Sequence, residues 1–462
     1  MSGGKTAAHC VMQPDVLIIG GGLAGLSAAV QLTEASHSVV LVERSPHCGG
    51  RARSFRDEVT GEDVDNGQHI MMGCYHETLR YLERIGSRHF IDIQPPLRAV
   101  FRENGRAAGL LLALPLPPPL HALSALLRFD LLTWPERMAI VRAARMLLAA
   151  NPAVDTKLQS QTVEEWLNDH AQPERCRKAF WDVLSIGMLN EQSGYASASL
   201  FVSTIQRVLS GRRTDASIVL PLAGLSRILV DPAVAYLNLH GSEVVLSSTV
   251  ESFGEENGRI RMAVMHGGRA ILPRAVIIAV PFFALDSVAN GFLLERLPAL
   301  RKAETLLPAP IISIHLWLDR EIMEEDFAAL LGSPIQWVFN TGKIQQLKRR
   351  SHLSLIVSGA WEDIEKEKSV LVAMGLEEVR KAFPAARNAS LVHSLIIKEK
   401  RSTFSPRPGS EQLRPFHRTA IENLFLAGDW TATGLPATIE GAVVSGVTSA
   451  NAAVEFLDRR LR

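Results

Sequence analysis

Short runs of apolar residues alternate with polar turns along the amino-terminal part of the chain. The run at 16–19 leads directly into Gly20, Gly22 and Gly25, which follow the spacing GxGxxG. Apolar residues then recur at helical spacing before a second apolar run at 39–42. Continuous short apolar runs are typical of strands buried on both faces, and a 3.6-residue period is typical of a helix. The pattern predicts a strand, a tight turn, a helix and a second strand.

The glycine-rich turn is suited to binding a pyrophosphate group. The first glycine permits the turn, the second lets the ligand approach the backbone, and the third lets the helix pack on the strand. Glu43 ends the second strand 18 residues after Gly25, close to the roughly 20 expected for a carboxylate that binds an adenosine ribose. A βαβ unit without a ligand accounts for the glycines alone. Together with Glu43 they favour dinucleotide binding, with Leu23, Ala24 and Arg44 beside the ligand.

Two polar loops downstream of Glu43 carry further candidate ligands. Gly49, Gly50 and Arg51 make a loop where the backbone can approach a ligand and a guanidinium can pair with phosphate. An ordinary surface turn is the alternative, which the position next to the ribose-binding acid disfavours. The second loop lies between apolar runs, so its polar groups need hydrogen-bond partners from a turn or a ligand. It consists of Asp65, Asn66, Gly67, Gln68 and His69.

The character of the sequence changes between residues 98 and 212. Residues 107–120 are apolar but broken by prolines, which excludes a regular helix and a central strand. Capping boxes, in which a threonine precedes a glutamate by three residues, start helical patterns at Thr133 and Thr162. We expect a helical insertion over 98–212. Its apolar loop has two interpretations, a buried connection or a lip that dips into a bilayer or admits an apolar substrate.

Strand patterns return after this insertion. An apolar strand is predicted at 275–280, and the patterns at 311–318 and 352–357 predict a mixed sheet. A last strand ends in Gly428-Asp429, which places an acid at the carboxyl edge of a sheet, where ligands of open α/β sheets bind. We therefore expect an α/β protein with a discontinuous Rossmann-like domain. The expected division is nucleotide-binding domain with the start of a substrate domain over 1–97, helical insertion over 98–212, nucleotide-binding domain over 213–285, mixed-sheet substrate domain over 286–405 and nucleotide-binding domain over 406–462.

Composition and charge exclude several classes of function. The chain has 462 residues, 47% of them hydrophobic, which suits a globular protein of two or three domains. Lysine and arginine number 49 against 48 acidic residues, which argues against a nucleic-acid partner. No apolar run is long enough to span a bilayer, and residues 1–14 lack a signal-peptide core, so we expect a cytoplasmic protein. No disulfide framework or metal site is indicated by the spacing of Cys10, Cys48, Cys74 and Cys176.

The motifs together resemble a known superfamily. The single nucleotide fingerprint, Gly49-Gly50-Arg51 and the late Gly428-Asp429 with its following helix resemble the flavin-dependent amine oxidases and carotenoid desaturases. Within that superfamily, the stretches 65–69, 75–79 and 426–442 resemble the hydroxysqualene dehydroxylase branch. The resemblance covers essentially the whole chain.

The resemblance implies an FAD enzyme that reductively removes the hydroxyl group of hydroxysqualene to give squalene, on the route to hopanoids. Its partners would be a C30 isoprenoid lipid and an external electron donor, with peripheral contact to the inner membrane as a further expectation. Asp429 would bind the ribitol or the pyrophosphate, and the helix beginning near Thr438 would point its amino end at the flavin. The implied FAD-binding residues are Gly20, Gly22, Leu23, Ala24, Gly25, Glu43, Arg44, Gly49, Gly50, Arg51, Gly67, Gln68, His69, Val250, Gly428, Asp429, Pro436, Ala437, Thr438 and Ile439.

Hydroxide is a poor leaving group, so a proton donor near the departing oxygen should speed the reaction. His69 and Asp65 are the candidates for that donor or for the network that holds it, although a histidine satisfied in a turn also accounts for His69. A carotenoid-type desaturase uses the same frame with opposite electron flow. Only four tyrosines are present to build an aromatic cage around an amine, which disfavours an amine oxidase. A flavin-free binding protein is the remaining class.

Overall fold

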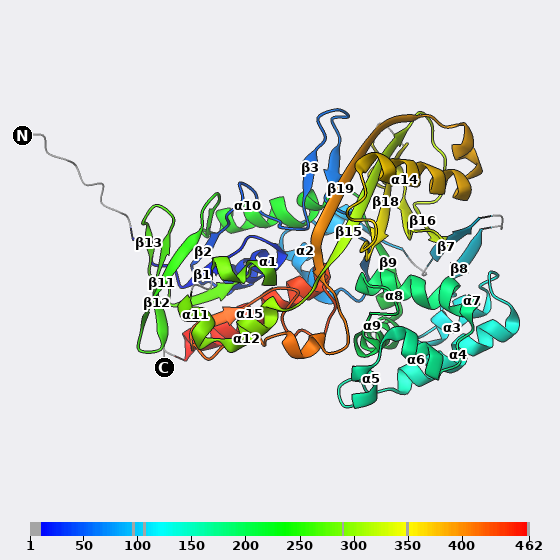
Figure 1. Ribbon diagram of the computed structural model, residues 1–462. Helices are drawn as coiled ribbons and strands as arrows, with labels where there is room; N and C mark the ends of the chain where they lie inside the picture. The colour runs from blue at the N-terminus through cyan, green and yellow to red at the C-terminus, as the bar shows by residue number, and fades with distance from the viewer. Residues whose placement is uncertain (1–10, 95–97, 105–107, 289–290, 348–350, 460–462) are drawn as a thin grey trace, which may run out of the picture.

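The structure is a computed structural model that describes residues 11–94, 98–104, 108–288, 291–347 and 351–459. Cys10 and residue 107, the first residue of the proline-broken apolar segment, lie outside the described residues. Figure 1 shows an α/β layer at one end of the molecule, a large sheet at the other end, and a group of helices beside that second sheet.

A five-stranded parallel sheet carries the glycine motif. The strand order is β10-β2-β1-β14-β20, and every neighbouring pair runs parallel. Four of the strands are buried along their whole length, as expected for strands covered on both faces. The chain supplies them from its start, its middle and its end: β1 (Val16–Ile19), β2 (Val39–Val42), β10 (Glu243–Val245), β14 (Ala275–Ile278) and β20 (Leu424–Leu426).

Helices α1 (Leu23–Glu34) and α15 (Ile439–Asp458) lie side by side against this sheet, with α10 (Asp231–Leu239) in the same apolar cluster (Figure 1). A Cβ atom added to Gly446 would lie 2.2 Å from the carbonyl oxygen of Ala24, so the two helices approach each other closely. The carboxyl-terminal segment therefore packs directly on the amino-terminal motif, which confirms the discontinuous α/β fold.

Alternate residues of each strand point to opposite faces of the parallel sheet. Those on the face opposite α1 and α15 belong to a second apolar cluster, which covers that face. An antiparallel hairpin forms part of this cover, and its turn places Asn257 and Gly258 at φ of 54° and 75°. Positive φ at both turn positions suits a tight hairpin. The covering elements are β11 (Val250–Glu256), β12 (Arg259–Met265), β13 (Ala270–Ile271), α11 (Gly291–Arg296) and α12 (Pro298–Glu304).

A seven-stranded mixed sheet forms the other end of the molecule, with strand order β19-β15-β18-β17-β16-β7-β8. Among the described strand pairs of this sheet, only β16–β7 is parallel. Helix α14 (Lys368–Ala382) packs on this sheet and buries Leu371, Gly375 and Val379. The strands are β7 (Arg98–Glu103), β8 (Gly109–Leu112), β15 (Pro308–Leu318), β16 (Phe327–Leu331), β17 (Trp337–Phe339), β18 (His352–Ser358) and β19 (Leu391–Phe404).

The segment 98–212 differs in part from the expected helical insertion, because it begins with the two strands β7 and β8. The prolines follow β8, which lies at the edge of the sheet, so no ladder hydrogen bond of a central strand is lost. Both capping boxes form, at Thr133 and Thr162. The helices that follow are α3 (Leu120–Leu127), α4 (Trp134–Ala149), α5 (Thr156–Ser160), α6 (Val163–Asp169), α7 (Glu174–Cys176), α8 (Asp182–Leu189) and α9 (Ala198–Ser210).

Short elements join the nucleotide-binding part to the rest of the chain. Among the described residues, no helix has the length and the apolar character needed to cross a membrane. The connecting elements are β3 (Ser54–Arg56), β4 (Asp63–Asp65), β5 (Met71–Met72), β6 (Ile91–Ile93), β9 (Ile218–Pro221) and α2 (His76–Arg84), whereas α13 (Thr341–Ile344) lies between β17 and β18 of the large sheet.

Candidate active site

One cavity of about 1100 Å³ extends from the carboxyl edge of the parallel sheet to the helices α3, α4, α8 and α9. Every cofactor-binding residue named from the sequence lines it except Gly25. A Cβ atom on Gly25 would lie 1.9 Å from the carbonyl oxygen of Gly20, so this glycine serves the close packing of helix on strand. The structure thus brings residues from both ends of the chain around one space.

The two glycine-rich loops form one wall of the cavity. Gly49 donates its backbone N–H to the carbonyl oxygen of Gly21 at 2.8 Å, which joins the loops. Gly20 has a φ of 110°, and a Cβ atom there would lie 2.7 Å from the carbonyl oxygen of Ala279. Apart from its chain neighbours, no described residue places an atom within 4 Å of a Cβ on Gly22, so the space beside it is open. Since α1 begins at the next residue with free backbone N–H groups, this wall fits a pyrophosphate.

Glu43 lies at the end of β2 and lines the cavity. Its Oε2 accepts a hydrogen bond from the backbone N–H of Gly21 at 2.6 Å, and its Oε1 accepts one from Ser45 at 2.8 Å. A carboxylate has about four acceptor positions, so two remain for the hydroxyl groups of a ribose. The residue therefore fits the role that its spacing predicts.

Arg51 and Asp429 meet in the wall of the cavity. Nη2 of Arg51 donates to Oδ1 of Asp429 at 2.7 Å, and Nη1 donates to the carbonyl oxygen of Ser402 in β19 at 2.5 Å. Gly428, at φ of 147°, donates its N–H to Oγ of Ser445 at 2.8 Å and fixes the turn before Asp429. The pair joins the first glycine-rich loops, the last strand of the parallel sheet and the large sheet.

The amino end of α15 also faces the cavity. Thr438 caps this helix by accepting the N–H of Gly441 at 3.1 Å, and Pro436, Ala437 and Ile439 line the cavity beside it. A helix of 20 residues presents partial positive charge at this end. The position suits an electron-rich group such as the pyrimidine side of a reduced flavin.

Sequence reasoning missed a buried ion pair next to this helix end. Glu440 is fully buried and accepts from the backbone N–H and the hydroxyl of Thr78 at 2.9 and 2.8 Å. Nη2 of Arg207, on α9, donates to the same carboxylate at 3.1 Å. An acid in the first turn of a helix is a local signal, but its partners lie more than 200 positions away. The pair ties the helical region to the nucleotide-binding part.

His69 lines the cavity, and its ring is held by the turn in which it lies. Its Nδ1 lies 2.5 Å from the carbonyl oxygen of Gly67. Because a carbonyl oxygen can only accept, Nδ1 carries the ring proton and Nε2 is an acceptor in the neutral ring. Burial, with a smaller effect of Arg51, lowers the pKa of His69. At neutral pH the imidazole is therefore uncharged.

Asp65 does not line the cavity, and in this the structure departs from a role as direct proton donor. Its Oδ1 accepts from Oγ of Ser54 at 2.6 Å and from the N–H of Leu225 at 2.8 Å. Burial raises its pKa to about 6. These contacts fix the β3–β4 hairpin against the segment that leads into α10, which gives Asp65 a structural role.

The far part of the cavity is a chamber with apolar walls. Residues of segment 107–120 contribute to it, since Leu111, Pro119 and Leu120 are lining residues. The same segment leaves Leu114, Leu116 and Leu120 exposed by 40%, 37% and 48%. It is therefore both a wall of the chamber and an apolar surface. Other apolar lining residues are Phe101, Leu123, Leu126, Ile140, Val141, Leu147, Leu148, Phe180, Trp181, Leu184, Ile205, Ile311, Trp337, Phe339 and Ile356.

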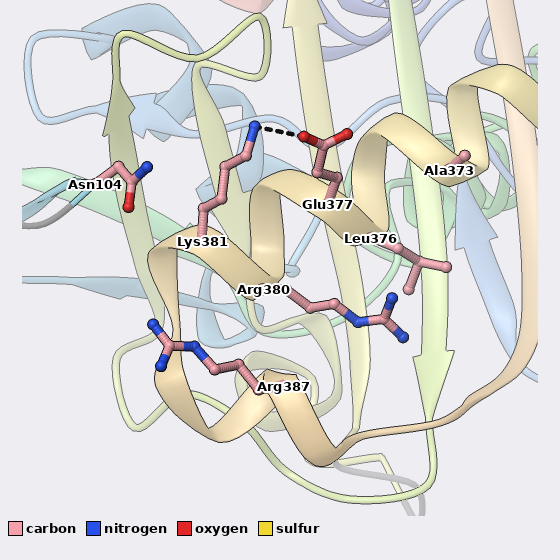
Figure 2. Close-up of a pocket in the computed structure, with 7 residues that line it drawn as sticks. All are labelled: Asn104, Ala373, Leu376, Glu377, Arg380, Lys381 and Arg387. Atoms are coloured by element: carbon pink, nitrogen blue, oxygen red, sulfur yellow. Dashed lines mark ion pairs between the residues drawn. The ribbon is translucent and has the colours of Figure 1, made fainter.

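A second, smaller hollow of about 440 Å³ lies on the outer side of α14. Figure 2 shows that it is shaped by charged side chains of this helix, with Lys381 paired to Glu377 at 2.7 Å and Arg380 and Arg387 nearby. Its arginines are exposed, and it contains none of the residues named from the sequence. The large cavity is therefore the candidate active site.

Comparison with known families agrees with this geometry. Residues 23–454 match the family described as flavin containing amine oxidoreductase. The chain is 28% identical over 454 residues to hydroxysqualene dehydroxylase of Zymomonas mobilis, which covers 95% of this chain and 98% of that protein. It is also 26% identical over 456 residues to 15-cis-phytoene desaturase of Glycine max, covering 96% of this chain and 79% of that one.

Solved structures share the fold. An oxidoreductase from Methanosarcina mazei superposes with a TM-score of 0.72 at 17% identity, covering 95% of this chain and all of that one. A putrescine oxidase solved with putrescine gives the same TM-score at 16% identity, covering 96% of this chain and all of that one. These similarities concern the fold alone. Since the family match spans almost the whole chain, this protein belongs to the flavin-containing amine oxidoreductase family, and its cofactor is FAD.

Proposed function

We propose that this enzyme reductively dehydroxylates hydroxysqualene to squalene in hopanoid biosynthesis. The observation that carries the proposal is the single cavity, in which the cofactor-site residues continue into a chamber with apolar walls. Hydroxysqualene is a hydrocarbon apart from one hydroxyl group, so burial of apolar surface favours its binding there. The hydroxysqualene dehydroxylase relative, aligned over 98% of its own length, supports the choice of this alcohol.

The residues around the near part of the cavity would hold FAD. The glycine-rich turn at Gly20 and Gly22 would bind the pyrophosphate, and Glu43 the adenosine ribose. Arg51 and Asp429 would bind the flavin side of the cofactor, and the amino end of α15 would face the ring. When bound and reduced, FAD supplies a hydride equivalent. The partial positive charge of α15 favours the electron-rich reduced form.

The chain must also deliver one proton to the departing oxygen. For each carbon–oxygen bond broken, one hydride and one proton are consumed and one water leaves, and an external donor restores the reduced cofactor. A neutral His69 stores no proton for this step, because its only ring proton is donated to Gly67. Its Nε2 can accept a proton and pass it on, so we assign His69 to a relay beside the substrate.

The proposal is tested by supplying reduced, anaerobic holoenzyme with hydroxysqualene and analysing the extracted lipid. We expect squalene together with oxidised flavin. If hydroxysqualene is recovered unchanged while the flavin stays reduced, the proposed reaction is wrong.

A carotenoid-type desaturase is the second candidate, since phytoene desaturases match the chain at 26% identity. The same cavity would accept a long polyene, and the electrons would flow from lipid to flavin. The two reactions are separated by oxidation state. Oxidised holoenzyme that introduces double bonds into phytoene, and reduced holoenzyme that leaves hydroxysqualene intact, would favour the desaturase.

We also propose that the exposed part of segment 107–120 contacts the inner membrane from the cytoplasmic side. Leu120 lines the cavity and is 48% exposed, and the exposed Arg145 lines the cavity on the facing helix α4. An exposed apolar segment beside a cation suits a bilayer surface that contains anionic lipid. A lipid substrate could then enter the chamber without crossing water.

A further inference from the structure

Five of the residues that line the large cavity are polar or charged and buried in the described structure. Two of them already form ion pairs, Asp429 with Arg51 and Glu440 with Arg207. The other three are Asn190, Ser358 and Thr403, with 8%, 9% and 9% of their surfaces exposed. Buried polar groups in an apolar wall are costly unless they have partners. These three therefore mark a polar position within the chamber.

Hydrogen bonds fix the three residues relative to one another. Asn190 ends α8 at φ of 54°, a conformation that asparagine tolerates better than most residues. Its Oδ1 accepts the N–H of Gly359, next to Ser358, at 2.8 Å, and its Nδ2 donates to Oγ1 of Thr403 at 2.9 Å. The orientation of the amide group is thus set by two different partners.

This arrangement leaves donors free. Nδ2 of Asn190 has a second N–H, and Thr403 accepts from Asn190, so its own hydroxyl proton remains available. Within the described part of the chain, the Ser358 hydroxyl has no hydrogen-bond partner, although its backbone N–H donates to Gln336 at 2.8 Å. By contrast, the hydroxyl of Thr204, which also lines the cavity, donates to Leu200 in its own helix at 2.7 Å.

A buried carboxylate behind this group holds both strands in place. Glu191 has no exposed surface and accepts from Nε1 of Trp361 at 2.9 Å and from the hydroxyl of Ser405. Trp361 follows Ser358 by three positions and Ser405 follows Thr403 by two. The dipeptide Asn190-Glu191 therefore anchors the ends of β18 and β19 at one point, which makes the donor group rigid.

The same point adjoins the cofactor site. Thr403 follows Ser402, whose carbonyl oxygen accepts from Arg51, and Arg51 is paired with Asp429. A ligand atom bound by Thr403 would therefore lie where the chamber meets the cofactor-binding residues. We propose that Asn190, Ser358 and Thr403 form the subsite that receives the hydroxyl oxygen of the lipid alcohol. This assignment rests on the proposed function and adds the residues that distinguish an alcohol from a hydrocarbon.

The subsite is tested by equilibrium binding to the oxidised holoenzyme, in which no turnover occurs. Hydroxysqualene and squalene are titrated separately, and binding is followed through the flavin absorbance. We expect the wild type to prefer the alcohol. Thr403→Val keeps the shape of the side chain without the hydroxyl, so we expect it to reduce the preference about tenfold. Thr403→Ser keeps the hydroxyl and should retain the preference within about twofold.

The controls distinguish a misfolded variant, a wrong subsite and a wrong proposed function from one another. Flavin content and the thermal midpoint report whether each variant is folded, and Ser358→Ala carries the same expectation if Thr403→Val is unstable. A folded Thr403→Val or Ser358→Ala protein with the full wild-type preference overturns the subsite, while the proposed function stands if the wild type still forms squalene. A wild type that neither prefers nor converts the alcohol overturns both.

Discussion

Nη2 of Arg51 lies 2.7 Å from Oδ1 of Asp429, although 378 positions separate the two residues in the sequence. Arg51 belongs to the loop that follows β2, and Asp429 follows β20, the last strand of the parallel sheet, by three positions. The ion pair shows that the nucleotide-binding domain is assembled from both ends of the chain, and it lies in the wall of the cavity.

Removal of this pair should weaken FAD binding. Asp429→Asn leaves the shape of the side chain but removes the charge opposite Arg51, so we expect the dissociation constant of FAD to rise about 10- to 100-fold. The measurement is titration of apoprotein with FAD. Glu365→Gln, which removes an exposed partner of Lys400, is the matched control and should leave FAD affinity unchanged. Equal FAD affinity in wild type and Asp429→Asn would show that this carboxylate does not hold the cofactor.

Loss of the buried Glu440 carboxylate should destabilise the fold. Glu440→Gln weakens hydrogen bonds from Thr78 and the ion pair with Arg207. We expect the free energy of unfolding to fall by about 2–3 kcal/mol, because the donors around this position lose a charged acceptor in a buried site. Urea unfolding followed by circular dichroism measures the effect. A change no larger than that of the exposed control Glu365→Gln would contradict the structural role of the pair.

His69 should affect turnover more than cofactor binding. Since its Nε2 is an acceptor in the cavity, His69→Ala removes a proton relay, and we expect kcat to fall by about 10²-fold. FAD content should stay close to that of the wild type, because the ring hydrogen bond is confined to its own turn. Steady-state kinetics with hydroxysqualene would check this. Unchanged turnover would remove His69 from the mechanism.

Stability should fall at acid pH because of two buried histidines. Nδ1 of His315 lies 3.1 Å from Nε2 of His352, and Trp317 stacks on His352 with ring centroids 4.1 Å apart. Burial lowers the pKa of His315 to about 4, and burial together with the neighbouring histidines lowers the pKa of His352 well below its usual value. The unfolded chain therefore binds protons first as the pH falls. The stability that these residues contribute is complete above about pH 6.5 and is lost below it.

The variant His315→Gln isolates this effect. Between about pH 6.5 and about pH 4, the free energy of unfolding of the wild type should fall more steeply than that of the variant, by about 1.4 kcal/mol per pH unit. Asp65 acts in the opposite direction, because burial raises its pKa to about 6 and its contribution to stability decreases as the pH rises towards that value. The contribution of Asp65 is the same in the wild type and in the variant, so it cancels when their free energies of unfolding are subtracted. Parallel pH profiles would contradict the prediction.

The exposed apolar residues of segment 107–120 should bind a membrane surface. Replacing Leu114, Leu116 and Leu120 by serine removes apolar area that the structure leaves in water. We expect wild-type holoenzyme to float with vesicles of phosphatidylethanolamine and phosphatidylglycerol, and the triple variant to float much less. Val392→Ser, at an exposed apolar position on the large sheet, is the control. Equal flotation of the wild type and the triple variant would exclude this segment as the contact.

Local patterns predicted much of the fold. The apolar runs at 16–19 and 39–42, the glycine spacing and the threonine caps all depend on residues close in sequence, and each element forms as expected. The strands β7 and β8 differ from the helical insertion expected over 98–212. β8 pairs with its chain neighbour β7, but the other partner of β7 is β16, which lies more than 200 positions later in the chain, so no local signal marked that pairing.

The same contrast between local patterns and long-range contacts applies to the residues of the candidate site. Glycines and Glu43 were recognisable because their spacing is fixed by one βαβ unit. The pairs Arg207–Glu440 and Asn190–Thr403 join segments that meet only in the folded protein, separated by 233 and 213 positions. Asp65 and His69 are neighbours in sequence, yet only His69 lines the cavity, because Asp65 turns towards Ser54 and Leu225.

The central claim is that FAD and a lipid alcohol react within one cavity. The most direct measurement is a single turnover, in which anaerobic enzyme with reduced FAD is mixed with hydroxysqualene, and flavin oxidation and squalene formation are followed together. We predict one squalene formed for each FAD oxidised. Flavin that remains reduced, or flavin that is oxidised without squalene formation, would contradict the account.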